Sequence, residues 1–143
     1  MAMARVAVGI MFLFFAQYKL MHTGFAHGGY QKYVTGYAQE TSVGFYRPFL
    51  NATLKYPVAS AYAVAVTELL IGLSMVAGLW VRQFATAGAL FMFNLTLATW
   101  RLPAGTEAWR YLGNQLDNIP LMMLFIIFVV HNAGETLGLD KPR

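Results

Sequence analysis

The residue best suited to chemistry in this sequence is an acid, Glu68, which lies inside a long apolar run. The run extends from Pro57 to Trp80 and includes the stretch AVAVTELLIGLSMVAG, with Glu68 near its middle. An ionised carboxylate at the centre of a hydrocarbon layer costs at least a few kcal/mol unless it is paired, hydrated or protonated. A carboxylate at that depth can accept a proton released from a bound quinol. Glu68 is therefore the candidate catalytic residue, as a proton acceptor.

Polar side chains from other apolar runs are the candidate companions of Glu68. Asn94 lies near the centre of the third run, and Arg101 follows seven residues later, on roughly the same face of a helix. Gln17 and Lys19 lie near the end of the first run. We expect these four residues to line a quinone pocket that opens toward one side of the membrane.

A second interpretation gives Glu68 a purely structural role. Gly72 follows it by one helical turn, and Ala61 and Ala65 also allow helices to approach closely, so Glu68 should face a tight seam between helices. A protonated Glu68 that is hydrogen-bonded to Asn94 would then join two helices without any chemistry. The sequence leaves both interpretations open.

The histidines and the absence of cysteine argue against a metal centre. His22 and His27 are five residues apart, which is not the spacing that places two ligands on one helix face, and His131 lies near the opposite membrane surface. No two histidines lie at matching depths on two helices, as a bis-histidine haem requires. With no cysteine in the chain, we expect no metal and no haem, and electron transfer would need a quinone or another bound cofactor.

The composition places these residues in a membrane. The chain has 143 residues, of which 58% are hydrophobic and 11% are charged, whereas soluble domains carry roughly 25% charged residues. Four apolar runs, at about 5–21, 57–80, 83–100 and 118–134, approach the roughly 20 residues that cross a hydrocarbon core. We therefore expect an all-α integral membrane protein, a four-helix bundle that forms a single transmembrane domain over residues 1–143.

The long segment 22–56, between the first two runs, is rich in aromatic residues. Three tyrosines recur at i, i+3 and i+7 and two phenylalanines at i and i+4, which predicts two short helices lying flat at the membrane interface: Tyr30, Tyr33, Tyr37, Phe45 and Phe49. The rings could form an ordinary aromatic girdle. They could also form a lid over a lipid-soluble ligand, or a docking surface for a partner subunit.

The expected partners and location follow from this composition. The net charge of +4 comes from basic residues scattered between apolar runs, which suits phospholipid headgroups and not nucleic acid. We expect membrane lipids and other protein subunits as partners, in the inner membrane of a prokaryote. The basic residues divide between the two sides and do not fix the orientation of the termini.

Several short motifs resemble the DoxX/DoxD-like family of small four-helix membrane proteins. They are an N-terminal arginine with a first run closing on Lys19-Leu20, then Glu68-x-x-x-Gly72, Gly78-Leu-Trp-Val-Arg82 and Gly134-Glu-Thr-Leu-Gly-Leu-Asp140. The resemblance extends over essentially the whole chain, and Glu68 and Arg82 match positions of the family pattern. Ala16-Gln17-Tyr18-Lys19 departs from it, because the family often has glycine before the lysine.

The resemblance implies a role in membrane redox chemistry. The family is best known through the membrane subunit of an archaeal thiosulfate:quinone oxidoreductase, and other members are linked to membrane redox complexes and oxidative-stress defence. We therefore expect a membrane subunit of a quinone-linked oxidoreductase complex. The alternative is a non-catalytic accessory subunit of a large respiratory or photosynthetic complex that contacts only lipids or pigments. The sequence leaves open whether the chain is itself an enzyme.

Overall fold

The computed structural model describes residues 1–102, 105–113, 115–135 and 138–140, and it contains helices and no strand within those residues. The all-α prediction is confirmed. Four longer helices are α1 (Ala2–Met21), α4 (Pro57–Ala77), α5 (Val81–Thr99) and α7 (Asn118–Val130). The shorter elements are the π-helix η1 (Phe25–Gly29), α2 (Tyr30–Glu40), the 3-10 helix η2 (Gly44–Tyr46), α3 (Arg47–Thr53) and α6 (Ala108–Gly113).

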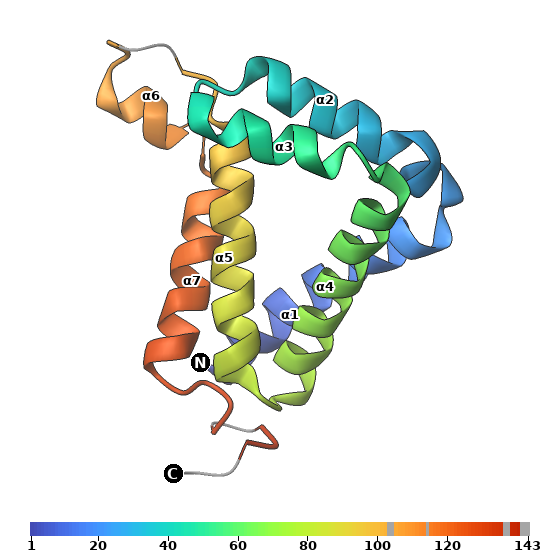
Figure 1. Cartoon of the computed structure of the whole chain (residues 1–143). Helices are drawn as coiled ribbons and strands as arrows, with labels where there is room; N and C mark the ends of the chain where they lie inside the picture. Colours follow the sequence, from blue (N-terminus) through green and yellow to red (C-terminus); the bar gives the residue numbers. More distant parts are fainter. Residues whose placement is uncertain (103–104, 114, 136–137, 141–143) are drawn as a thin grey trace.

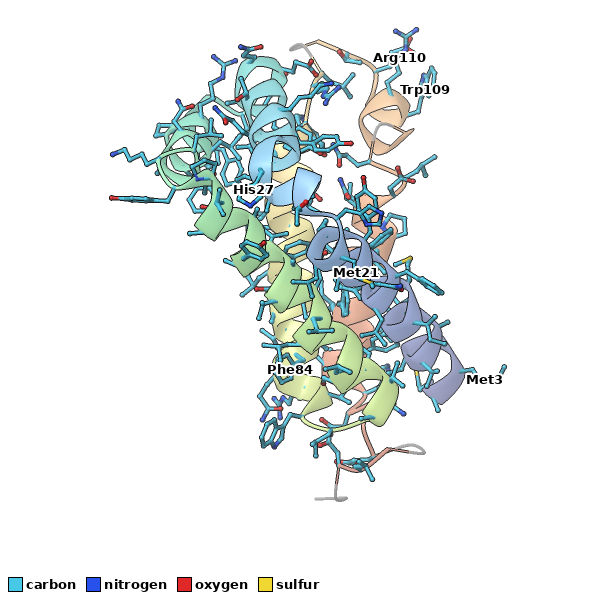
Figure 2. The ribbon with its side chains drawn as sticks, turned by 90° about the vertical axis from the view of Figure 1, so that its right-hand side faces the viewer. Met3, Met21, His27, Phe84, Trp109 and Arg110 are labelled. Atoms are coloured by element: carbon cyan, nitrogen blue, oxygen red, sulfur yellow. The ribbon has the colours of Figure 1, made fainter. Side chains whose placement is uncertain are left out.

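The long helices form two pairs that diverge from a shared turn. α1 packs along α4, and α5 packs along α7. In Figure 1, α4 and α5 meet at the tight turn at one end and separate toward the other end, where α2 and α3 lie across the opening. We call the segment from Tyr30 to Thr53, which carries α2 and α3, the roof. Met3 and Met21 mark the two ends of α1 in Figure 2, with Met21 at the roof end.

Two of the four expected spans are long and apolar enough to cross a membrane, namely α1 and α4. The bounds of all four differ from the sequence prediction. α1 begins at Ala2, α4 ends at Ala77 and α5 covers Val81–Thr99. The largest correction is to the run 118–134. There α7 stops at Val130 because the backbone turns and Asn132 adopts a positive φ of 44°.

The seam between α1 and α4 depends on two glycines. A Cβ added at Gly9 would lie 2.8 Å from the Cβ of Met75 and 2.9 Å from the backbone nitrogen of Val76. A Cβ added at Gly72 would lie 2.9 Å from the side chain of Leu13 and 3.0 Å from the Gly9 carbonyl oxygen. Small residues at these positions let the two backbones approach closely. The predicted tight seam at Gly72 is therefore confirmed.

Aromatic packing joins the two helix pairs. Gly88 on α5 leaves room for the ring of Phe125 on α7, because a Cβ at Gly88 would lie 2.6 Å from that ring. Phe12 on α1 contacts Phe125 edge to face, with ring centroids 5.3 Å apart. Both phenylalanines are buried. They lie near the middle of α1 and of α7 and fill the space between the two pairs.

Thr41 fixes one end of the roof to α5. The hydroxyl of this buried residue donates to the carbonyl oxygen of Leu97 at 2.8 Å. The next backbone amide, of Ser42, donates to the carbonyl oxygen of Trp100 at 2.7 Å. Arg47, at the start of α3, donates to the Thr41 carbonyl oxygen at 2.8 Å. The end of α2 and the start of α3 are therefore tied to the end of α5.

The opposite end of the molecule is closed by segments from three parts of the chain. Gly78 has a left-handed φ of 68°, and a Cβ there would also collide with the guanidinium of the fully buried Arg5. The Asp140 carboxylate accepts hydrogen bonds from the backbone amides of Trp80 at 2.6 Å and Val81 at 3.0 Å. The Asp140 amide in turn donates to the Gly78 carbonyl oxygen at 2.8 Å. The tail thus caps the start of α5.

Replacing Gly9 with alanine should destabilise the protein. Because the added Cβ meets a Cβ and a backbone nitrogen, no rotamer change can relieve the overlap, and we expect a loss of about 1–3 kcal/mol. The measurement is the thermal unfolding midpoint in detergent. Gly36→Ala is the matched control, since a Cβ at Gly36 meets nothing within 4 Å. Equal midpoints for the two variants would show that the seam is not tight.

Replacing Asp140 with alanine should loosen the tail. The first backbone amides of α5 lose their carboxylate acceptor, and loss of a helix cap costs about 0.5–2 kcal/mol. We expect a lower unfolding midpoint and faster proteolysis near the C-terminus. Glu135→Ala serves as the control, because the exposed Glu135 side chain makes no hydrogen bond to the described residues. Proteolysis at the wild-type rate in Asp140→Ala would contradict the proposed cap.

Candidate functional site

A cavity of 510 Å³ lies between the two helix pairs, under the roof. Its walls come from α1, η1, the roof, α4 and α5, and most of the lining side chains are aromatic or aliphatic. The lining residues are Tyr18, Lys19, Phe25, Tyr30, Tyr33, Val34, Tyr37, Tyr46, Phe49, Leu50, Thr53, Val64, Glu68, Phe91, Asn94, Leu95 and Ala98. This size and apolar character are typical of a small-molecule site.

An ion pair lies on the α1–α4 wall of the cavity. The Lys19 ammonium donates a hydrogen bond to Oε1 of Glu68. The Glu68 side chain is only 3% exposed, whereas that of Lys19 is 20% exposed. Oε2 of Glu68 is buried and has no hydrogen-bond partner among the described residues. Glu68 itself is one of the residues that line the cavity.

A neutral hydrogen-bonded pair lies on the α5 wall. The hydroxyl of Tyr46 donates to Oδ1 of Asn94 at 2.7 Å, and Nδ2 of Asn94 donates to the carbonyl oxygen of Leu90 at 2.7 Å. Burial, with a smaller contribution from nearby Tyr30, raises the pKa of Tyr46 to about 12. The phenol therefore stays protonated at physiological pH and remains a hydrogen-bond donor.

The cavity brings together three of the five residues that the sequence singled out, namely Lys19, Glu68 and Asn94. Gln17 is exposed and lies outside the lining. Side chains two positions apart on an α-helix point about 200° away from each other, so Gln17 and Lys19 cannot face the same cavity. Arg101 forms an ion pair with Glu40 at 2.7 Å. Its predicted position failed because α5 ends at Thr99, so helical spacing does not extend to Arg101.

The predicted hydrogen bond between Glu68 and Asn94 is absent, since Glu68 bonds Lys19 and Asn94 bonds Tyr46. Glu68 belongs to α4 and Asn94 to α5, and these two helices stand on opposite sides of the opening (Figure 1). Tyr46 is the site residue that sequence reasoning missed. Its only signal was its place in the aromatic segment, since its partner lies on a distant helix.

The tyrosines of α2 behave as their spacing predicts. Tyr30, Tyr33 and Tyr37 recur on one helix face, and all three line the cavity. A neighbouring cleft of 360 Å³ shares Tyr33, Tyr37 and two further residues with the cavity and is also lined by Arg101. The aromatic segment thus covers the cavity.

The histidines lie outside the cavity lining. His22 is exposed and stacks on Tyr18, with ring centroids 4.8 Å apart. His27 is also exposed and lies where η1 joins the roof in Figure 2. Among the described residues, no three His, Asp or Glu side chains gather as metal ligands would.

The cavity can hold an amphipathic ring. Its aromatic walls accept a flat apolar body. Its polar side-chain groups are the Lys19–Glu68 pair, the Tyr46–Asn94 pair, the hydroxyls of Tyr18 and of the three α2 tyrosines, and the Thr53 hydroxyl. Lys19 also lies 5.5 Å from the centroid of the Phe25 ring, a cation–π contact that positions the ammonium at the cavity wall.

Comparison with known proteins identifies the family. The DoxX family model matches residues 1–101, which include α1, the roof, α4, α5 and every residue that lines the cavity. The closing motif from Gly134 to Asp140 lies outside the matched range, although the resemblance read from the sequence included it. No curated protein and no solved structure matches the chain. The chain belongs to the DoxX family of membrane proteins.

Proposed function

We propose that the protein is the membrane subunit of a quinone-linked oxidoreductase complex and that its cavity binds the quinone headgroup. The observation that carries this proposal is that Glu68, whose Oε2 has no hydrogen-bond partner among the described residues, lines an apolar, aromatic cavity. A buried acceptor without a partner is costly, and a ligand hydroxyl would satisfy it.

The same proposal places α1, α4, α5 and α7 across the membrane, with the roof at its interface. Large apolar side chains point outward from all four helices, as lipid contact requires and as a soluble bundle avoids. They include Phe14 and Phe15 on α1, Leu70 and Leu73 on α4, Leu90 and Phe93 on α5, and Met123 and Ile126 on α7. α7 is about 20 Å long and therefore needs its flanking turns to approach a hydrocarbon core of about 30 Å.

The polar wall matches both redox states of a quinone. A quinone carbonyl accepts hydrogen bonds, and the Lys19 ammonium carries donors beyond the one that it gives to Glu68. A quinol hydroxyl donates, and Oε2 of Glu68 is a free acceptor. The ring itself would lie among the side chains of Phe25, Tyr30 and Phe91.

Glu68 then acts as the proton acceptor. When a quinol is oxidised, two electrons and two protons leave it, and the hydroxyl bonded to Oε2 gives its proton to the Glu68 carboxylate. The second proton leaves from the other hydroxyl. The two electrons pass to a redox centre of a partner subunit, since the chain itself has no cysteine to hold an iron–sulfur cluster or to form a redox disulfide.

The accessory-subunit alternative is favoured by one observation. Lys19 and Glu68 join α1 to α4, so the pair could serve the fold alone. That role explains the hydrogen bond to Oε1 of Glu68. It does not explain why Oε2 has no partner among the described residues or why a 510 Å³ cavity lies beside it. The two functions differ in what happens to turnover when Glu68 becomes neutral.

Glu68→Gln should abolish quinone-linked turnover while leaving assembly intact, because the glutamine amide oxygen can still accept a hydrogen bond from the partly exposed Lys19. Glutamine keeps the size of the side chain but cannot accept the proton, and general-base catalysis is worth about 10²-fold or more. The measurement is quinone-linked electron transfer in membranes that carry the variant in place of the wild-type chain, together with co-purification of the partner subunits. The control is Glu40→Gln, which neutralises the exposed carboxylate paired with Arg101. Wild-type turnover in Glu68→Gln would establish the accessory role instead.

Lys19→Met should destabilise the fold strongly, because it leaves the Glu68 carboxylate buried without its cation. Loss of one partner of a buried ion pair costs about 3–5 kcal/mol. The double variant Lys19→Met/Glu68→Leu, which removes both charges, should recover most of that loss. Thermal unfolding in detergent measures both, with the exposed Lys32→Met as control. Equal stability of the single and double variants would show that the pair carries no buried charge.

A further inference from the structure

The cavity has two polar poles, and they lie on opposite walls. We call Lys19 with Glu68 the first pole and Tyr46 with Asn94 the second pole. The first pole comes from α1 and α4, whereas the second comes from η2 and α5. α4 and α5 stand on opposite sides of the opening under the roof (Figure 1). The lining between the poles is largely apolar.

Each pole offers both a donor and an acceptor. At the first pole these are the Lys19 ammonium and Oε2 of Glu68. At the second pole both functions of the Asn94 amide are already used, by Tyr46 and by the Leu90 carbonyl oxygen. The Tyr46 oxygen keeps its lone pairs as acceptors, and its proton can turn from Asn94 to a ligand.

The position of Tyr46 is fixed by its surroundings. The residue is 8% exposed and its ring packs on that of Phe49, with centroids 5.1 Å apart. The hydrogen bonds of Thr41 and Arg47 tie this part of the roof to the end of α5, which also carries Asn94. Tyr46 and Asn94 therefore keep their places when the cavity is empty.

We infer that the ligand is a para-quinone and its quinol, held by one oxygen at each pole, and that Tyr46 is the residue that selects for the second oxygen. This inference rests on the proposed quinone function and narrows it to one class of ring. A para-quinone accepts from Lys19 and from Tyr46. Its quinol donates to Glu68 and to the Tyr46 oxygen. The two oxygens of an ortho-diol are adjacent, so both lie at one pole and the other pole has no ligand oxygen to bind.

The test compares ring ligands that differ only in their hydroxyls. The protein in lipid nanodiscs is titrated anaerobically with decylhydroquinone, whose hydroxyls are para, with decylcatechol, whose hydroxyls are ortho, and with decylphenol, which has one. One well-placed hydrogen bond in a buried site is worth about a factor of ten in affinity. We expect decylhydroquinone to bind about tenfold more tightly than either of the other two.

The double variant Tyr46→Phe/Asn94→Leu removes the second pole. Replacing both partners of a buried hydrogen bond with apolar groups of similar shape leaves stability nearly unchanged. We expect this variant to bind decylhydroquinone about tenfold more weakly than wild type and to bind decylphenol with unchanged affinity. Tyr56→Phe, which alters a tyrosine that is 74% exposed, should keep the wild-type preference.

Four outcomes would overturn the inference, and they separate it from the proposed function. Equal affinity of wild type for the three ligands, or an intact para preference in the double variant, would disprove the second pole while leaving the quinone site standing. Tighter binding of decylcatechol would assign both oxygens to the first pole. No binding of any ligand by the folded wild type would overturn the quinone function itself.

Discussion

The short turn between α4 and α5 is the constraint on which the rest of the structure depends. Gly78 and Trp80 both adopt positive φ angles there, so two long helices are joined with almost no linking chain. The Arg5 guanidinium packs against Gly78 in the turn, and the Asp140 carboxylate accepts hydrogen bonds from the backbone amides that follow it. Held so close at one end, the two helix pairs diverge toward the other. The opening that results is too wide to be filled by the helices themselves and is covered by the roof.

Small residues and aromatic residues have different roles in this arrangement. Within each pair, Gly9, Gly72 and Gly88 lack side chains and let helices and rings approach closely. Where the pairs diverge, tyrosines and phenylalanines line the space without filling it. Glu68 lies one helical turn from Gly72, toward the roof end of α4. At this position its buried side chain lines the cavity.

The sequence predicted the parts of this arrangement that local periodicity controls. The depth of Glu68 in an apolar run, the small residue at Gly72 and the shared face of Tyr30, Tyr33 and Tyr37 all follow from helical spacing. Arg101 was misplaced because helical spacing was extended past the last turn of α5. Tyr46 could not be found, because its contact with Asn94 joins residues 48 positions apart and depends on how the roof folds back. The C-terminal end of α7 depends on the backbone turn at Asn132, whose positive φ cannot be predicted from a hydrophobic pattern.

The ion pair between α1 and α4 also bears on how the chain is assembled in a bilayer. Lys19 lies near the end of α1, where a long side chain can reach the headgroups, so α1 can enter a membrane by itself. Glu68 lies at the middle of α4, where inserting an isolated charged residue is opposed by about 3 kcal/mol. Its cation comes from a helix that is synthesised 49 residues earlier. In the proposed topology, α1 would therefore act as an insertion partner for α4, and the order of the two helices along the chain would set the order in which they enter the membrane.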